Sequence, residues 1–209
     1  PLLSVRDLSV SFSTDEGEVT ALDRVDFDVF SGKTVGLVGE SGCGKSVTAY
    51  SIMRLLPKPI GKVISGKVNF DGIDLLNLSP EKMREVRGNQ IGMIFQEPMN
   101  ALNPVQKIGA QLSEVFNIHK NITDHQAWLS SIEMLDAVGI PSPENRVHEY
   151  PHQLSGGMRQ RVVIAMALAC QPKLIIADEP TTALDVTVQA QILDLLKNLQ
   201  KKSGSSILL

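Results

Sequence analysis

The chain has 209 residues, 43% hydrophobic and 21% charged, so it is long enough to bury its own core and has neither a disordered nor a fibrous composition. A formal net charge of −3 provides no overall basic field, which argues against nucleic acid or an anionic lipid surface as a direct partner. The longest apolar run, residues 162–170, is far shorter than the ~20 residues that span a bilayer, so we expect any membrane role to depend on a partner.

The first half of the chain predicts mainly strands. Apolar residues alternate or cluster as strands require in residues 3–12, 19–30, 34–38, 67–70 and 91–95. The first two of these stretches predict an antiparallel pair. An apolar helix is expected from Lys45 to about Leu56, where Pro57 stops it, and Ser79 with Pro80 predicts another helix start.

The second half predicts mainly helices. Over residues 97–153 the strand pattern disappears and apolar residues recur at helical spacing, which indicates a helical insert. Thr123 and Gln126 form a capping box within this insert. Two further helices are expected over residues 157–170 and, capped by Asp185, up to about Lys202. The remaining strands are predicted at residues 174–177 and 206–209.

A glycine-rich loop follows the strand predicted at residues 34–38. Its sequence GESGCGKS fits the phosphate-loop pattern G-x-x-x-x-G-K-[ST], and a predicted strand and helix flank it as the motif requires. Backbone N–H groups and the helix N-terminus would hold phosphate, Lys45 would neutralise the β- and γ-phosphates, and Ser46 would ligate Mg²⁺. The alternative is a glycine-rich turn that binds nothing. The residues expected to contact the nucleotide here are Gly39, Glu40, Ser41, Gly42, Cys43, Gly44, Lys45, Ser46 and Val47.

Two adjacent carboxylates, Asp178 and Glu179, follow the buried strand predicted at residues 174–177. The carboxyl ends of parallel strands are where such sheets bind ligands. Asp178 would hold Mg²⁺ through its water shell, and Glu179, pointing the other way, would polarise the attacking water. The alternative is an acidic pair that begins a surface loop.

The segment LSGGMRQR, residues 154–161, resembles the LSGGQ signature of ATP-binding-cassette (ABC) ATPases, with Met158 in the usual glutamine position. The other motifs of the family occur in the family order: the phosphate loop, Gln96 after a strand, the signature, DEP at residues 178–180 and ALD at residues 183–185. Ser155 is expected to cap a helix whose first N–H groups, at Gly156 and Gly157, form a second anion-binding end.

The resemblance implies an α/β fold with a P-loop NTPase core, a mostly parallel sheet, an N-terminal antiparallel β subdomain and an α-helical insert. It implies one ABC ATPase domain over residues 1–209, with its core at 1–96 plus 155–209 and the insert at 97–154. The family places a histidine after the strand that begins near Ser206, and the sequence ends at Leu209, so we expect the domain to be truncated at its C-terminus.

In this family two domains meet head to tail, and the signature of one closes over the nucleotide of the other. The resemblance then makes Glu179 and Lys45 catalytic, lets Gln96 link Mg²⁺ and the attacking water to the insert, and lets Asp185 couple the two sites. Phe12 occupies about the position of the aromatic residue that stacks on adenine, and the alternative is that it is part of the strand core. His119, His125, His148 and His152 have no ligand spacing and are expected on surfaces or loops.

Within the family, residues 93–104, 150–153 and 185–191 resemble the oligopeptide, dipeptide and nickel importer branch. The implied protein hydrolyses ATP to ADP and phosphate and powers peptide import. Its partners would be a second ATPase domain, transmembrane permease subunits and, indirectly, an extracytoplasmic solute-binding protein, with no nucleic acid. Cysteine spacing without a disulfide or metal framework, and the lack of a signal-peptide pattern, suit the cytosol. The resemblance implies a peripheral location on the cytoplasmic face of the cell membrane.

Three alternatives remain open at this stage. The first is nickel or another small molecule as the solute, because membrane subunits and the binding protein select it. A soluble ABC ATPase of DNA repair, chromosome organisation or translation is disfavoured because the chain lacks long coiled-coil inserts, tandem cassettes and a basic surface. A P-loop kinase or GTPase is disfavoured because no N-K-x-D sequence occurs and the signature segment would have no role.

Overall fold

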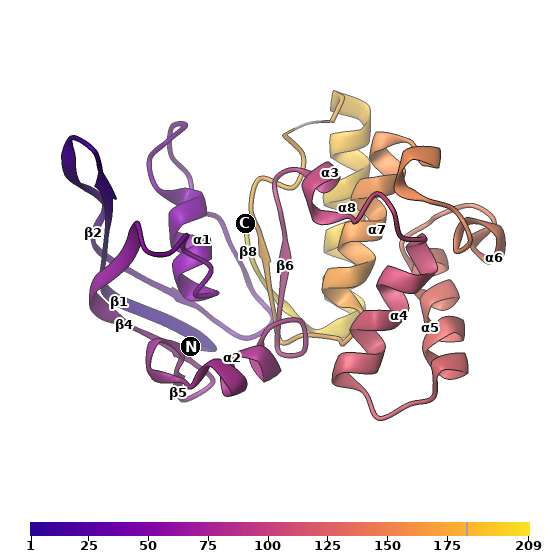
Figure 1. Cartoon of the computed structure of the whole chain (residues 1–209), viewed down its shortest axis with the longest axis horizontal. Helices are drawn as coiled ribbons and strands as arrows, with labels where there is room; N and C mark the ends of the chain where they lie inside the picture. The colour runs from indigo at the N-terminus through magenta and orange to yellow at the C-terminus, as the bar shows by residue number, and fades with distance from the viewer. Residues whose placement is uncertain (183) are drawn as a thin grey trace. The chain divides into compact units, whose positions relative to one another are not determined.

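The computed structural model describes residues 1–182 and 184–209, and the side chains of residues 98 and 99 are left out of the description. The chain forms two compact units (Figure 1). The first comprises Pro1–Arg84 with Ser206–Leu209, and the second comprises Glu85–Ser205. Each is described on its own below.

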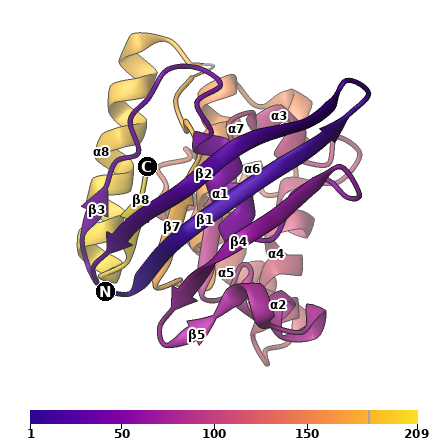
Figure 2. The same cartoon turned by 90° about the vertical axis from the view of Figure 1, so that its left-hand side faces the viewer.

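An antiparallel sheet forms most of the first unit (Figure 2). Its strands, in spatial order, are β2 (Gly17–Val29), β1 (Leu3–Thr14), β4 (Gly61–Phe70) and β5 (Ile73–Asp74). The alternation along these strands buries one set of side chains, including Leu3, Val5, Val10, Val68 and Phe70. The pairing of β1 with β2 confirms the antiparallel pair expected from the period-two spacing.

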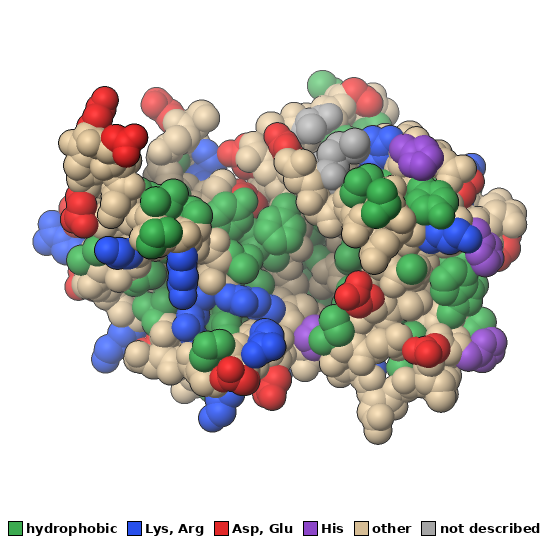
Figure 3. Space-filling model, viewed as in Figure 1, with side chains coloured by type: hydrophobic (Ala, Val, Ile, Leu, Met, Phe, Trp, Pro, Cys, Tyr) green, Lys and Arg blue, Asp and Glu red, His purple; other side chains and the backbone are tan. Residues whose placement is uncertain are grey.

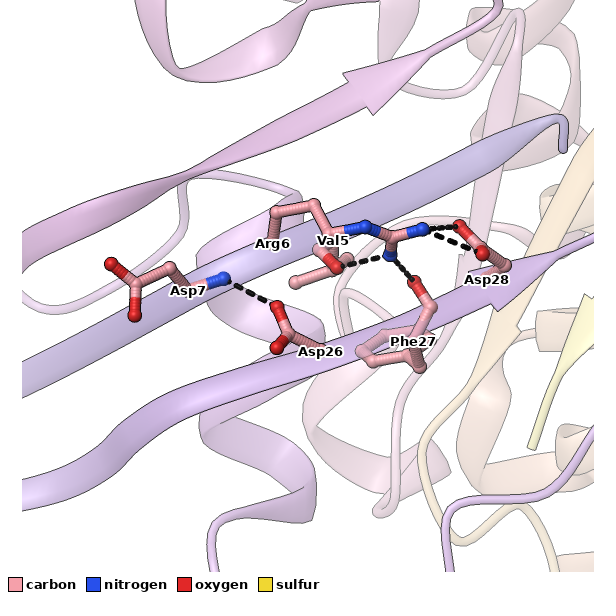
Figure 4. A network of polar contacts seen from close by, with 6 residues as sticks. All are labelled: Val5, Arg6, Asp7, Asp26, Phe27 and Asp28. Carbon is pink, nitrogen blue, oxygen red and sulfur yellow. Dashed lines mark hydrogen bonds and ion pairs between the residues drawn. The ribbon is translucent and has the colours of Figure 1, made fainter.

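A bulge in β1 is fixed by polar contacts with β2 (Figure 4). The register shifts between Val5 and Leu8, where Asp7 has a φ of 49° and its backbone N–H donates to Asp26 at 2.6 Å. The Arg6 guanidinium bonds both carboxylate oxygens of Asp28, at 2.8 and 2.7 Å. This hydrogen-bonded guanidinium lowers the pKa of the Asp28 carboxyl and ties the edge strand to its neighbour.

The first unit also contains a parallel pair, β3 (Thr34–Val35) with β8 (Ser206–Leu208). Only two residues of the strand predicted at 34–38 belong to the ladder, although the Leu37 N–H still bonds the Leu209 carbonyl at 2.7 Å. Helix α1 (Lys45–Ile52) follows, then the 3₁₀ turn η1 (Leu75–Asn77) and helix α2 (Pro80–Val86), whose last two residues are assigned to the second unit.

Helix α1 is shorter than predicted: the expectation that it reaches Leu56 is wrong. Arg54 adopts a left-handed backbone conformation with φ 53°, which ends the helical path. Its guanidinium donates to the carbonyl oxygens of Leu75 and Leu78, at 3.2 and 2.5 Å, and these contacts hold the chain reversal in place.

The second unit is built around two parallel strands, β6 (Ile91–Ile94) and β7 (Leu174–Ala177), in which every residue is buried. Helix α7 (Gly156–Leu168) packs against β6. The approach is so close that a Cβ on Gly92 would overlap the carbonyl oxygen of Ala167. The other helical segments are α3 (Pro98–Ala101), α4 (Ile108–His119), α5 (Asp124–Ala137), α6 (Pro143–Arg146), η2 (Pro151–Gln153) and α8 (Val186–Ser203).

Residues 97–153 of the second unit contain helices and no strand, as the apolar spacing predicts. Helices α4 and α5 lie side by side (Figure 1). The predicted capping box is present at the start of α5: Gln126 N–H donates to Thr123 Oγ1, and Thr123 N–H donates to Gln126 Oε1. At its end, Gly139 with φ 75° and the Ile140 N–H bond to the Leu135 carbonyl form a Schellman turn.

No helix in the described part of the chain combines the length and the hydrophobicity that a membrane crossing requires.

Candidate active site

The glycine-rich loop of the first unit joins β3 to α1. Gly42 and Gly44 have φ values of 81° and 99°, a region that residues with a side chain rarely adopt. A Cβ on Gly44 would also lie 2.6 Å from a methyl carbon of Leu22 and 3.0 Å from the carbonyl oxygen of Ala21. Both the backbone shape and the packing of the loop on β2 therefore require glycine at position 44.

Lys45 is the first residue of α1, and its ammonium group turns back over the loop. Nζ donates to the carbonyl oxygens of Gly39 and Glu40, at 2.8 and 2.9 Å. Ser46 and Val47 complete the start of the helix. A helix N-terminus presents backbone N–H groups and a positive dipole end, so the loop, the helix and Lys45 together form a site suited to phosphate.

Phe12 lies in β1, half-buried, opposite Gly61 of β4. A Cβ on Gly61 would stand 3.0 Å from the Phe12 ring, so the ring covers that glycine. One side of the ring is therefore packed against the sheet, and its partial exposure leaves both the adenine-stacking and the strand-core interpretations in place.

The two carboxylates of the second unit have different surroundings. Asp178 is 5% exposed, and its backbone N–H bonds the Ile94 carbonyl of the adjacent strand at 2.9 Å. Glu179 is half-buried and has a φ of 45°, an unusual value for a residue with a side chain. The chain thus turns sharply immediately after β7.

The Glu179 carboxylate lies next to Gln96, which follows β6. Gln96 Nε2 donates to Glu179 Oε2 at 3.1 Å, and Thr182 Oγ1 donates to the same oxygen at 2.9 Å. The structure thus brings together two of the residues singled out in the sequence and adds Thr182, which the sequence analysis missed. A carboxylate oriented in this way is able to accept a proton from a water molecule.

Ser155 forms the N-cap of α7, and its Oγ accepts the Met158 N–H at 3.3 Å. A Cβ on Gly156 would meet open space, whereas one on Gly157 would lie 3.1 Å from Val188 Cγ1. Asp185 caps α8 in the same manner, accepting the Val188 N–H at 3.0 Å. The N-termini of α7 and α8 therefore lie side by side within the second unit.

Ala183, of the predicted ALD motif, lies outside the described residues.

Comparison with known proteins identifies the family. Residues 22–182 match the family model for "ABC transporter". The chain belongs to this ABC family. Its match to the ABC model includes the phosphate loop, Gln96, the signature segment and the paired carboxylates.

Curated relatives carry transport names. The chain is 56% identical to the oligopeptide transport ATP-binding protein OppD of Bacillus subtilis (strain 168), over 99% of this chain and 58% of the relative. It is 54% identical to the dipeptide transport ATP-binding protein DppD of the same organism, over 100% of this chain and 62% of the relative. It is 52% identical to the oligopeptide transport ATP-binding protein OppD of Escherichia coli (strain K12), over 100% of this chain and 61% of the relative. The chain thus spans about three-fifths of the length of these ABC relatives.

Solved ABC structures confirm the predicted fold class. The ATP-binding cassette MJ0796, in a dimeric post-hydrolysis state bound to ADP and Pi, matches with a TM-score of 0.86 and 28% identity, covering 99% of this chain and 86% of that chain. The structure of cbiO1 from Clostridium perfringens matches with a TM-score of 0.78 and 28% identity, covering 99% of this chain and 76% of that chain. The α/β class with an antiparallel sheet, parallel strands and helices is therefore that of ABC cassettes.

The histidines contribute no metal cluster. Histidine side chains appear at separate places on the face shown in Figure 3, and within the described residues no group of three or more His, Cys, Asp or Glu side chains is arranged to hold a metal ion. His119 differs from the expected surface or loop setting, because it is half-buried in the last turn of α4. Its ring lies against Gly88: a Cβ added to that glycine would be 2.9 Å from His119 Nε2. Burial lowers the pKa of His119. His148 contacts the Trp128 ring, with centroids 5.2 Å apart.

Proposed function

We propose that this chain binds ATP with Mg²⁺, hydrolyses it to ADP and phosphate, and thereby powers a membrane importer of peptides. The observation that carries the hydrolytic part is the Glu179 carboxylate, oriented by Gln96 and Thr182 at the carboxyl end of a buried strand, in a chain that also has a phosphate loop. Membership of the ABC family supports both parts.

The phosphate loop would bind the triphosphate, with Lys45 neutralising the β- and γ-phosphates. Mg²⁺ would be held by Ser46, Gln96 and, through water, Asp178. These side chains offer hydroxyl, amide and carboxylate oxygens, which are the ligands that Mg²⁺ prefers, so the residues present fit the ion. The bound ion would neutralise charge on the phosphates, and Glu179 would accept the proton of the attacking water.

The second anion-binding end, Ser155 with Gly156 and Gly157, would close over the nucleotide of a second ATPase domain in a head-to-tail dimer. The exposed position of Ser155 and the open space beside Gly156 leave room for such a contact. The dimeric state named for the MJ0796 cassette supports a dimer. Asp185 would couple the two sites, and Phe12 would stack on adenine. The division into a core of residues 1–96 plus 155–209 and an insert of residues 97–154 belongs to this proposal.

The oligopeptide and dipeptide names of the relatives support peptides as the solute. Transmembrane permease subunits would then be direct partners and an extracytoplasmic solute-binding protein an indirect one, with the chain on the cytoplasmic face of the cell membrane. Uptake of a labelled tripeptide by cells that carry wild-type or Glu179→Gln protein tests the solute. Unchanged uptake by the variant would contradict this assignment.

Nucleotide binding is tested by Lys45→Ala and a fluorescent ATP analogue. Loss of the ammonium charge should weaken binding at least about 100-fold. Lys62→Ala is the matched control, because Lys62 is an exposed lysine on β4 of the same unit. Equal affinity of Lys45→Ala and wild-type protein would overturn the proposed site.

A further inference from the structure

Gln160 lies on α7, and its whole side chain is buried, with 1% of the residue exposed. Its amide nitrogen donates a hydrogen bond to the carbonyl oxygen of Pro180 at 2.6 Å. Its amide oxygen is buried as well and meets no hydrogen-bond partner among the described residues. Burial of an unpaired polar atom costs free energy, and the hydrogen bond to the Pro180 carbonyl offsets part of that cost. The single bond to Pro180 is therefore the contact that distinguishes glutamine here.

Pro180 directly follows Glu179, whose φ of 45° is a backbone conformation that persists only where the surroundings hold it. Thr182 N–H bonds the Glu179 carbonyl at 3.2 Å, and Thr182 Oγ1 and Gln96 hold the carboxylate. These contacts come from residues that follow β6 and β7, and they hold Glu179. The bond from Gln160 comes from helix α7 and holds the next residue, Pro180.

The helix that carries Gln160 begins at the Ser155 cap. Val162, Val163 and Ile164 follow it as buried residues, and α7 packs against β6, α4 and α5. Close-packed interiors transmit a displacement instead of absorbing it. A shift of the Ser155 end would therefore reach Gln160 and, through one hydrogen bond, the turn that carries Glu179.

We propose that Gln160 is a positioning residue, which holds the Glu179 turn in its reactive conformation and links it to the Ser155 end of the same chain. This inference rests on the proposed function. Contact of Ser155 with the nucleotide of a partner copy then favours the reactive position of Glu179 toward the chain's own nucleotide. The hydrogen bond from Gln160 to Pro180 is the physical link between the two events.

The test replaces Gln160 by Met, which has a similar length and volume and no amide donor, in the full-length protein. We expect kcat for ATP hydrolysis to fall about tenfold while KM and the affinity for the fluorescent ATP analogue stay within about twofold, as for a residue that acts only on the reactive geometry. The matched control is Gln111→Met. Gln111 is another buried glutamine, whose amide donates to the carbonyls of Asn103 and Gln106, at 3.0 and 2.9 Å. Its loss should lower the melting temperature and leave kcat per folded molecule unchanged.

A second variant, Gln160→Glu, separates positioning from packing. The ionised carboxylate has no donor for the Pro180 carbonyl, whereas the protonated acid regains an O–H donor. Its kcat relative to wild type should therefore rise as the pH is lowered from about 8 to about 6, because burial raises the pKa of a carboxyl group. Wild-type kcat in Gln160→Met, or an equal fall in Gln111→Met, would overturn the inference. Failure of the wild-type protein to hydrolyse ATP would instead overturn the proposed function.

Discussion

The side-chain amide of Gln96 donates a hydrogen bond to Oε2 of Glu179 at 3.1 Å, across 83 positions of the chain. Thr182 donates to the same oxygen from the loop that follows. Two donors on one oxygen restrict the rotation of the carboxylate. Gln96, just before the helical region, thus contacts the turn after β7 at the Glu179 carboxylate. This carboxylate is the group proposed to accept a proton.

Glu179→Gln should reduce ATP hydrolysis at least about 100-fold and leave ATP affinity intact. The glutamine oxygen still accepts hydrogen bonds from Gln96 and Thr182, but an amide does not take a proton from water. Phosphate release and equilibrium binding measure the two quantities, and ATP-bound dimers should accumulate on size-exclusion chromatography.

Glu133→Gln is the control for this prediction, because Glu133 is an exposed carboxylate on α5. It should hydrolyse ATP at the wild-type rate. A Glu179→Gln protein that hydrolyses ATP normally, or that stays monomeric with saturating ATP, would contradict the role given to this residue.

Gly92→Ala should destabilise the protein by about 2 kcal/mol or more, because the added methyl group meets the Ala167 carbonyl, which is backbone and has no rotamer with which to move away. In a chain of this size such a loss corresponds to a melting temperature lower by roughly 5 °C. Gly36→Ala is the matched control, since a Cβ there meets no atom within 4 Å. Equal melting temperatures of the two variants would show that α7 and β6 do not approach as closely as described.

Features that depend on neighbouring residues were predictable from the sequence. The caps at Ser155, Thr123 and Asp185 need only a short side chain and the next turn of helix, and all three form as expected. The strands β6 and β7 are short apolar runs; β7 lies at the predicted residues, and β6 ends at Ile94, one residue before its predicted end.

Features that depend on distant residues were not predictable in this way. The end of α1 is set by Arg54, whose partners Leu75 and Leu78 belong to a later segment. The local pattern carries no sign of these contacts, so the helix was wrongly predicted to extend to Leu56. The hydrogen bond between Gln96 and Glu179 was not predicted, because family resemblance implied a role for each residue and not their contact. Gln160 lies between Arg159 and Arg161, just before the apolar run of residues 162–170, so its local sequence does not predict that it is buried.

His119 should make the folded protein less stable in mild acid. Burial, with a smaller contribution from Lys120, lowers its pKa from the ordinary 6.5, so the folded state favours the neutral ring. Well above pH 6.5 the ring is neutral in both states. As the pH falls below 6.5 the unfolded chain binds the proton first, so the free energy of unfolding decreases until the pH passes the pKa of the folded state.

Urea unfolding of wild-type and His119→Gln protein between about pH 7 and about pH 5 measures this effect. The variant should lose less stability than the wild type over that interval. His125→Gln, which replaces an exposed histidine of α5, should follow the wild-type curve. Parallel curves for His119→Gln and wild type would show that this histidine is not the titrating group.

The two cysteines should react at very different rates with a thiol reagent such as DTNB, and ATP should change only the faster one. Cys43 is exposed in the phosphate loop, whereas Cys170 is buried and its burial raises the pKa of the thiol, which lowers the reactive thiolate fraction. We expect a fast phase that Cys43→Ser removes and a slow phase that follows unfolding. Saturating ATP with Mg²⁺ should slow the fast phase, because phosphates in the loop would cover the Cys43 backbone and approach its side chain. A fast phase insensitive to ATP, in protein that binds the fluorescent analogue, would place the nucleotide somewhere other than residues 39–46.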